Sequence, residues 1–168
     1  MVRQLLAFDE AILLGLRRWQ LPTVTRLMRV LTRVGDGSSW IFLGLVLLAA
    51  GGPARRCGML LGGAALFATM LSQALKRICK RPRPSSGIGG FIALAENPDV
   101  FSFPSGHTCA AFAVAIALAG QGWLGPLHFS LALAIGMSRV YLGAHYPLDV
   151  AAGATLGLIA GAAARLLI

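Results

Sequence analysis

Three short polar clusters interrupt an otherwise apolar chain, and their residue types suit chemistry on a phosphate group. The first covers residues 76–84 with the spacing K-x6-R-P, the second is P-S-G-H at residues 104–107, and the third covers residues 138–149 with the spacing S-R-x5-H-x3-D. Each lies at the end of an apolar stretch, so a helical bundle could gather all three at one end. Cations, two histidines and a carboxylate would then form an anion site that contains a nucleophile.

The first cluster contains two kinds of cation that bind phosphate differently. Arg83 presents a planar fork of N–H donors that suits bidentate phosphate contact, whereas Lys76 supplies a compact point charge. Prolines at 82 and 84 stiffen the chain on both sides of Arg83. Considered alone, the cluster is explained slightly better as a basic anchor beside the membrane.

The second cluster opens an apolar helix. Ser105 suits the N-cap position, and Gly106 allows backbone N–H groups to approach a ligand closely. Free N–H groups at a helix N-terminus bind anions, and His107 beside such an anion could protonate a leaving oxygen. The alternative is a capped helix with an interfacial histidine, which is about equally consistent with this motif alone.

The third cluster pairs a histidine with a carboxylate beside a cation, Arg139. Pro147 suits the first turn of the last helix, which places His145 just before that helix and Asp149 within it. Asp149 could accept the Nδ1 proton of His145 and leave Nε2 free to attack phosphorus. A structural His–Asp pair is the alternative, but the two other cation-bearing motifs favour catalysis.

Two further readings of these residues are weaker. Two histidines and an aspartate resemble a zinc site, but three converging cations, Lys76, Arg83 and Arg139, would repel a divalent ion. We therefore predict metal-independent chemistry without a cofactor. A serine hydrolase that uses Ser105 is disfavoured because the pattern G-x-S-x-G is absent around it.

The composition indicates an integral membrane protein. Charged residues make up 12% of the 168 residues, hydrophobic residues make up 57%, and the mean hydropathy is +0.74, whereas soluble domains are about 25% charged. Apolar runs cover residues 38–52, 57–75, 108–124, 127–138 and 150–164. A soluble helical bundle is the alternative, but these runs lack a polar stripe. We predict an all-α, integral-membrane helical bundle of about five transmembrane helices, in which residues 38–168 form the catalytic core.

The first 34 residues differ from the rest. Two stretches alternate apolar and charged residues, and the second carries Arg26, Arg29 and Arg33. Both are typical of amphipathic helices that lie in the headgroup region with their cationic faces toward anionic lipid. The alternative for residues 5–16 is a truncated or tilted extra span. With residues 1–34 as an interfacial segment, we treat 1–168 as a single domain.

Topology and charge follow from these elements. If each apolar run crosses once, all three polar clusters fall on one face of the membrane. The formal charge is +9, from 15 Lys and Arg against 6 Asp and Glu. Because the cations flank the spans, we expect an anionic lipid bilayer as partner and no nucleic acid. Which compartment the clusters face, and the oligomeric state, are left open.

Together, the motifs K-x6-R-P, P-S-G-H and S-R-x5-H-x3-D resemble the signature of the type 2 phosphatidic acid phosphatase (PAP2) superfamily. That family includes membrane lipid phosphatases and vanadium haloperoxidases on a soluble fold. The resemblance implies that His145 is the nucleophile of a phosphohistidine intermediate, that Asp149 orients it, and that His107 protonates the leaving group and later activates water. It implies phosphate binding by Lys76, Arg83, Ser105, Gly106 and Arg139. Membrane members commonly have six spans, so the N-terminal topology departs from the family.

The resemblance implies a hydrolase acting on a lipid phosphate or diphosphate in a membrane, and we expect the bacterial inner membrane. Candidate substrates are polyprenyl diphosphates, towards which we lean, phosphatidylglycerophosphate, phosphatidic acid and lipid A phosphates. A vanadate-dependent haloperoxidase and a non-catalytic lipid-phosphate binding or transport protein are the alternatives. Residues 85–103 are expected to form a mobile loop over the site, with Phe91, Ile92 and Phe101 directed toward the lipid.

Overall fold

The computed structural model describes residues 2–95 and 99–167, and most of this part of the chain is helical. The helices are α1 (Val2–Leu16), α2 (Pro22–Val34), α3 (Gly37–Ala50), α4 (Gly52–Cys79), α5 (Pro84–Gly87), α6 (Gly106–Ala117), α7 (Leu124–Tyr141) and α8 (Pro147–Leu167), with a 3₁₀ turn at Arg17–Trp19. Within the described residues the β pairing amounts to one isolated bridge, between Pro82 and Phe101. The predicted all-α class is therefore confirmed.

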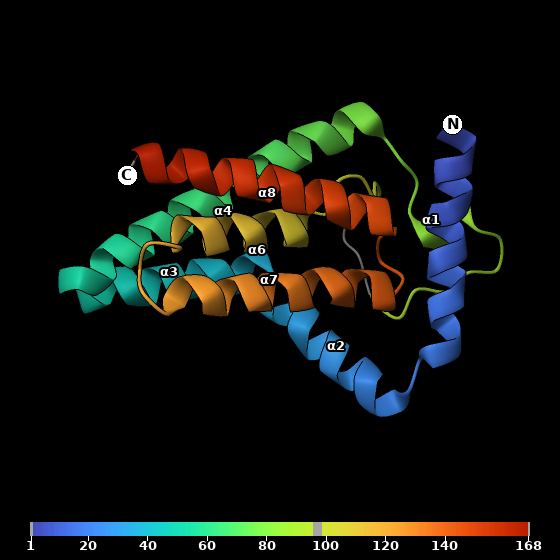
Figure 1. The fold of residues 1–168 in the computed structure, drawn as a ribbon, viewed down its shortest axis with the longest axis horizontal. Helices are drawn as coiled ribbons and strands as arrows, with labels where there is room; N and C mark the ends of the chain where they lie inside the picture. Colours follow the sequence, from blue (N-terminus) through green and yellow to red (C-terminus); the bar gives the residue numbers. More distant parts are fainter. Residues whose placement is uncertain (1, 96–98, 168) are drawn as a thin grey trace.

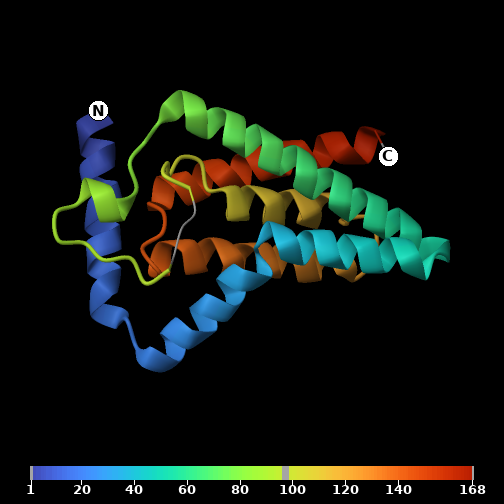
Figure 2. The same ribbon diagram turned by 180° about the vertical axis from the view of Figure 1, so that it is seen from behind.

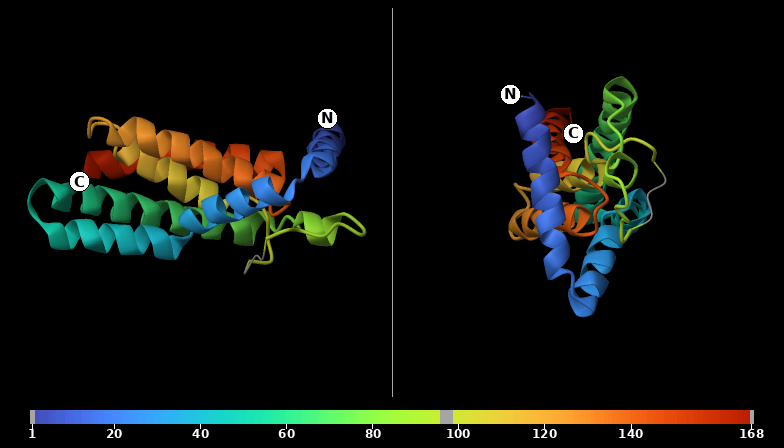
Figure 3. Two further views of the ribbon diagram at one scale, coloured as in Figure 1. Left: turned by 90° about the horizontal axis from the view of Figure 1, so that it is seen from below. Right: turned by 90° about the vertical axis from the view of Figure 1, so that its right-hand side faces the viewer.

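The long helices share one direction, and two N-terminal helices do not. α3, α4, α6, α7 and α8 run roughly along the long axis of the molecule (Figures 1 and 2). α6 packs against α4, α7 and α8, and α3 packs against α4. α1 lies across one end of this bundle, and α2 slants from that end toward α3 (Figure 3). α4 and α7 end near α1 while α6 and α8 begin there, so the three polar clusters share that end of the bundle.

α6 forms the centre of the bundle. It is rich in alanine, and nine of its twelve residues are buried. At 1.5 Å per residue it is about 18 Å long, which is shorter than the hydrocarbon core of about 30 Å. The apolar run predicted to continue to residue 124 leaves the helix after Ala117, and Gly122 in the following turn has a positive φ of 59°. Because other helices surround α6, it does not need the length of a lipid-facing span.

A stripe of glycines brings α8 into close contact with α6. Gly153, Gly157 and Gly161 are spaced four residues apart, so they lie on one face of α8. A Cβ atom at Gly157 would lie 2.4 Å from the carbonyl oxygen of Cys109, and one at Gly161 would lie 2.3 Å from that of Ala113. Small residues are the usual means of close helix approach in membranes. This packing holds the start of α8 beside the start of α6.

The number of membrane crossings stays a prediction. Of the described helices, α4 and α8 are each long and apolar enough to cross a membrane, and α2 with α3 could form one more span bent by 55°. The five predicted crossings exceed this number because α3 and α6 are short and α7 carries polar residues such as His128 and Arg139. The predicted division between residues 1–34 and 38–168 falls at the bend between α2 and α3, and it too stays a prediction.

α1 contacts the bundle through a few buried residues, and several of its other described side chains are exposed. Leu13 is fully buried and packs with Phe91 and Tyr146, and Asp9 is also buried. Phe8 and Leu14 on the same helix are exposed. An apolar exposed face on a helix that crosses the end of the bundle is the arrangement expected of an interfacial helix. The predicted interfacial helix and the alternative, a truncated or tilted span at residues 5–16, both stay predictions.

Candidate active site

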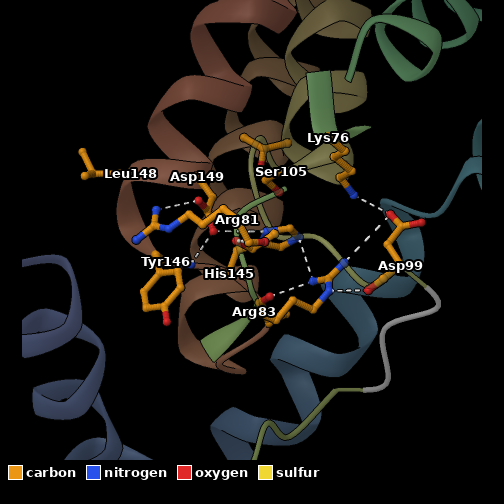
Figure 4. Close-up of polar contacts among 12 residues, drawn as sticks. Lys76, Arg81, Arg83, Asp99, Ser105, His145, Tyr146, Leu148 and Asp149 are labelled. Atoms are coloured by element: carbon orange, nitrogen blue, oxygen red, sulfur yellow. Dashed lines mark hydrogen bonds and ion pairs between the residues drawn. The ribbon is translucent and has the colours of Figure 1, made fainter. Parts of the chain in front are cut away.

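The first cluster surrounds a carboxylate. Lys76, in the last turn of α4, and Arg83, just before α5, are both buried. Lys76 donates a hydrogen bond to the Asp99 carboxylate, and Arg83 Nε donates to the Asp99 carbonyl oxygen at 2.5 Å. Arg83 Nη2 also lies 3.9 Å from Asp99 Oδ2 (Figure 4). Asp99 thus places an anionic oxygen between the two cations predicted to bind phosphate.

The charge of Asp99 is stabilised where it lies. Burial alone would raise the pKa of its carboxyl group, but the hydrogen bond and charge of Lys76, followed by Gln73 and the charge of Arg83, hold that pKa below its ordinary value. A phosphate oxygen that entered this position would replace a carboxylate that is ionised at neutral pH. Asp99 was missed at the sequence level because nothing in its local pattern places it opposite α4.

The second cluster adjoins the first through Gly106. A Cβ atom at this position would lie 3.4 Å from Ser72 Oγ and 3.9 Å from Lys76 Nζ, so α6 begins close to the lysine. Ser105 occupies the N-cap position as predicted, but its hydroxyl makes no capping hydrogen bond. Instead its Oγ accepts a hydrogen bond from Thr108 Oγ1 at 3.0 Å. The first N–H groups of α6 therefore have no hydrogen bond to the Ser105 side chain.

His107, the other functional residue of this cluster, has a carboxylate partner that sequence reasoning missed. Its Nε2 lies 2.7 Å from Oδ1 of Asp36. Asp36 occupies the N-cap position of α3, at the bend that follows α2. Gly35, which precedes Asp36, packs closely against α7, since a Cβ there would lie 2.8 Å from Cγ2 of Ile135. The sequence signal was the isolated acid in the turn before an apolar run.

The third cluster places a buried histidine between α7 and α8. The backbone N–H of His145 donates to the Arg139 carbonyl at 3.2 Å, and its Nε2 lies 3.3 Å from Arg83 Nη1. Burial, followed by the charges of Arg139, Arg83 and Lys76, holds the pKa of the His145 imidazole well below its ordinary value. The ring is therefore neutral at pH 7, and one of its nitrogens carries a lone pair.

Asp149 lies beside His145 but makes its hydrogen bonds elsewhere. The His145 Nδ1 to Asp149 Oδ2 distance is 3.6 Å, which is longer than a hydrogen bond. Oδ2 instead accepts from the backbone N–H of Tyr146 at 2.9 Å, and Oδ1 accepts from Arg81 Nη1 at 2.7 Å. Asp149 is thus positioned to orient the imidazole after a small movement, and Arg81 competes for it.

Arg81 connects Asp149 to the N-terminal helix. Its Nη2 donates to Oδ2 of Asp9 at 2.6 Å, and Oδ1 of Asp9 accepts from the backbone N–H of Leu148 at 2.9 Å. The guanidinium also lies 4.0 Å above the ring of Tyr146. Figure 4 shows how these contacts gather around the start of α8. Sequence reasoning treated Arg81 as one of several basic residues and Asp9 as part of an interfacial helix.

Arg139 joins the site to α2. It lies in the last turn of α7, is buried, and donates a hydrogen bond from Nη1 to Thr32 Oγ1. Beside it is a polar cavity of about 490 Å³, lined by Arg29, Thr32, Arg33, Asp36, Leu94, Ala95, His107 and Arg139. All the predicted site residues therefore lie at one end of the bundle, and this cavity gives access to His107 and Arg139.

The loop that follows α5 covers part of the site, with one difference from expectation. The backbone N–H of Leu94 donates to the Leu142 carbonyl at 2.8 Å, which ties the loop to the end of α7. Ile92 is exposed, so its contact with lipid stays a prediction, whereas Phe91 is buried, and the guanidinium of Arg17 lies 4.6 Å from the Phe91 ring centroid. Phe91 anchors the loop because its aromatic ring gains more from burial against α1 than from exposure.

The surroundings of the site suit an oxyanion. Within the described parts of the chain, no group of three or more His, Cys, Asp or Glu residues is placed to hold a metal ion. The cations Lys76, Arg83 and Arg139 instead lie near enough to His145 to lower its pKa. Several fixed positive charges in a buried site favour a group with developing negative charge.

Comparison with known proteins agrees with this geometry. Residues 58–168 match the model of the PAP2 superfamily. The chain is 32% identical to an undecaprenyl-diphosphatase of Sulfolobus acidocaldarius over 140 residues, which cover 82% of this chain and 68% of that one. It is 35% identical to a decaprenylphosphoryl-5-phosphoribose phosphatase of Mycobacterium tuberculosis over 143 residues, which cover 84% and 78%.

Two solved structures have the same fold over nearly the whole chain. A transmembrane PAP2-type phosphatidylglycerolphosphate phosphatase from Bacillus subtilis aligns with a TM-score of 0.80 and 25% identity, covering 98% of this chain and 86% of its own. LpxE from Aquifex aeolicus aligns with a TM-score of 0.80 and 27% identity, covering 92% of both chains. With the match over residues 58–168, these likenesses establish that the chain belongs to the PAP2 superfamily.

Proposed function

We propose that this protein is a metal-independent lipid phosphatase that hydrolyses a lipid phosphate or diphosphate through a phosphohistidine on His145. That the chain is a membrane-embedded lipid phosphate hydrolase follows from its family and relatives. The observation that carries the finer proposal is the buried, neutral His145, whose Nε2 lies 3.3 Å from Arg83 Nη1. A lone pair held beside a phosphate-binding guanidinium is placed for attack on phosphorus.

The first step transfers the phosphoryl group to the histidine. Lys76, Arg83 and Arg139, with the first backbone N–H groups of α6, bind the non-bridging oxygens, and the Asp99 carboxylate is displaced. His145 Nε2 forms a bond to phosphorus while the bond from phosphorus to the lipid oxygen breaks, and the electron pair stays on that oxygen. These donors lower the barrier because they are already oriented in a buried site.

Two carboxylates orient the two histidines for this step through hydrogen bonds. Asp149 Oδ2, now 3.6 Å from Nδ1 of His145, moves closer and accepts a hydrogen bond from Nδ1–H, which orients the imidazole. Asp36 Oδ1 accepts a hydrogen bond from Nε2–H of His107. The proton given to the leaving oxygen is therefore a second one, which Nδ1 holds when the ring is in its imidazolium form. In the second step water attacks the phosphohistidine, His107 takes the water proton, and phosphate leaves. The same residue thus acts first as acid and then as base.

Phosphate release in EDTA tests the proposal. Purified protein in neutral detergent is assayed with polyprenyl diphosphate, phosphatidylglycerophosphate and phosphatidic acid, and His145→Ala serves as the control. We expect EDTA-resistant release that the substitution abolishes, and acid-labile labelling of the wild type by a ³²P substrate. Turnover that persists in His145→Ala would refute the mechanism, and halide oxidation after vanadate loading would favour haloperoxidase chemistry. We place the enzyme in the bacterial inner membrane, which fractionation tests.

A further inference from the structure

The polar cavity beside His107 contains cations that the mechanism does not use. Arg29 and Arg33 line it from α2, four residues apart and therefore on one face of that helix. Thr32 lies on the same face, and its hydrogen bond from Arg139 fixes this face against the site. Arg29 Nε also donates to the Leu94 carbonyl at 3.2 Å, which closes the cavity on the loop side.

Arg29 and Arg33 bring two positive charges into this cavity. Within the described residues, no carboxylate forms an ion pair with Arg29 or Arg33. Asp36, the acid that lines the cavity, is engaged by His107. Like charges four residues apart destabilise a helix, so an anion between the two guanidinium groups would stabilise α2. The cavity has the volume of a small-ligand pocket, about 490 Å³.

The position of the cavity relative to the nucleophile identifies which part of the substrate enters it. In-line displacement places the leaving group on the side of phosphorus opposite His145. His107, which protonates that leaving group in the proposed mechanism, lines the cavity. The leaving group therefore passes between His107 and the α2 arginines. A lipid alcohol would bring nothing for these arginines to bind, whereas a lipid phosphate would bring an anion.

We propose that Arg29 and Arg33 form a second phosphate subsite, which binds the inner phosphate of a lipid diphosphate and makes diphosphates the preferred substrate. The inference rests on the proposed function. The bond from His145 Nε2 to the terminal phosphorus forms, and the bond from that phosphorus to the bridging oxygen breaks. The electron pair stays on the bridging oxygen, and the lipid monophosphate leaves with it. Water then releases phosphate from His145, so the overall reaction consumes one water.

The test compares farnesyl diphosphate with farnesyl monophosphate in neutral detergent. We expect the wild type to prefer the diphosphate in kcat/KM. Arg33→Ala should lower kcat/KM for the diphosphate by about 10-fold and change that for the monophosphate less than about 2-fold. This effect is smaller than the 10²–10³-fold loss typical of a buried donor because Arg33 is exposed. Arg33→Lys should recover part of the loss, since it restores the charge without the fork.

Arg26→Ala is the matched control, because Arg26 is exposed on the same helix but does not line the cavity. Arg26→Ala should leave kcat/KM unchanged for both substrates. An equal loss for the two substrates in Arg33→Ala, or no loss for the diphosphate, would overturn the subsite. A second arm adds anionic phosphatidylglycerol to the micelles. If the Arg33→Ala effect appears only with that lipid, the arginines bind bilayer headgroups and the proposal is wrong.

A binding measurement that does not depend on turnover tests the second phosphate subsite separately from the proposed function. Titration calorimetry of His145→Ala with inorganic pyrophosphate and inorganic phosphate should show tighter binding of pyrophosphate, and adding Arg33→Ala should remove that difference. Equal affinities before the second substitution would refute the subsite. If neither farnesyl substrate gives His145-dependent release, the proposed function fails, and this binding comparison still decides whether a second phosphate is bound.

Discussion

The buried carboxylate of Asp9 offers a sharp test of whether the N-terminal helix contributes to the active site. Asp9 is 1% exposed, and its oxygens accept hydrogen bonds from Arg81 and from the backbone N–H of Leu148. In Asp9→Asn the amide can still accept one of these hydrogen bonds, but the charge that faces Arg81 is lost. The guanidinium then turns wholly to Asp149, which draws that carboxylate away from His145.

The magnitude follows from the contacts that are lost. A hydrogen bond to a charged group contributes about 1.5–3 kcal/mol. For a chain of this size, 1 kcal/mol corresponds to about 2–4 °C in Tm, so Asp9→Asn should lower the Tm by about 3–12 °C. Asp9→Ala removes both acceptors and leaves a mostly buried guanidinium with one carboxylate, for which we expect about 3–5 kcal/mol. In activity, kcat should fall with little change in KM, because phosphate binding does not involve Asp9.

The assay combines thermal unfolding in detergent with steady-state phosphate release. Glu10→Gln is the matched control, because Glu10 is the exposed neighbour of Asp9 on α1. It should leave Tm and kcat unchanged. If Asp9→Asn had the Tm and kcat of the wild type, α1 would be a membrane anchor without a role in the site. A lower Tm with unchanged kcat would restrict Asp9 to a structural role and remove Arg81 from the positioning of Asp149.

Three further predictions concern the other carboxylates and the nucleophile. Asp99→Asn should lower the Kd for inorganic phosphate, because the anion no longer competes with an ionised carboxylate for Lys76, and calorimetry measures this. Asp36→Ala should lower kcat more than it raises KM, since the imidazole of His107 loses its partner, and steady-state kinetics separate the two. His145 has a folded pKa below its unfolded value. As the pH falls through about 6.5, His145 gains a proton in the unfolded chain but not in the folded chain, so the folded state loses stability. In thermal melts from pH 7.5 to pH 5, the Tm of His145→Asn should therefore fall less than the Tm of the wild type.

Each of these outcomes has a clear opposite. Weaker phosphate binding in Asp99→Asn would mean that the carboxylate organises the cations and does not compete with substrate. An unchanged kcat in Asp36→Ala would show that Asp36 does not orient His107 for catalysis. Equal loss of stability at low pH in the wild type and His145→Asn would show that His145 does not account for the acid sensitivity.

Much of the candidate site could be predicted from the sequence because the relevant constraints are local. Helix ends are marked by changes from apolar to polar residues, and Pro147 marked the start of α8 two residues before Asp149. His145 comes two residues before α8 and Asp149 lies in the first turn of that helix, so their short separation in sequence keeps the two side chains near each other. The same local logic placed the clusters at one end of the bundle, since alternating antiparallel helices bring every second helix end to the same side.

Helix lengths and the loop were predicted less well. Apolar composition alone did not indicate that α6 ends at Ala117, because a helix surrounded by protein does not need to match the thickness of the bilayer. The burial of Phe91 depends on the position of α1, which its own neighbours in sequence do not specify. The glycine stripe of α8 was visible in the sequence, but its register against α6 was not.

The tertiary structure alone decided where the acidic residues lie. Besides Asp149, three acidic residues in the described part of the chain contact groups of the site: Asp9 contacts Arg81, Asp36 contacts His107, and Asp99 contacts Lys76. They come from α1, a bend between helices and a loop, at positions 23–72 residues away from those partners. Their spacing in sequence therefore carries no information about contact. The sequence by itself determined which residues could act on a phosphate, through motifs at helix ends. Which charges surround them was decided by the packing of α1, α2 and the loop, because burying a cation is favourable only where the fold supplies a carboxylate within reach.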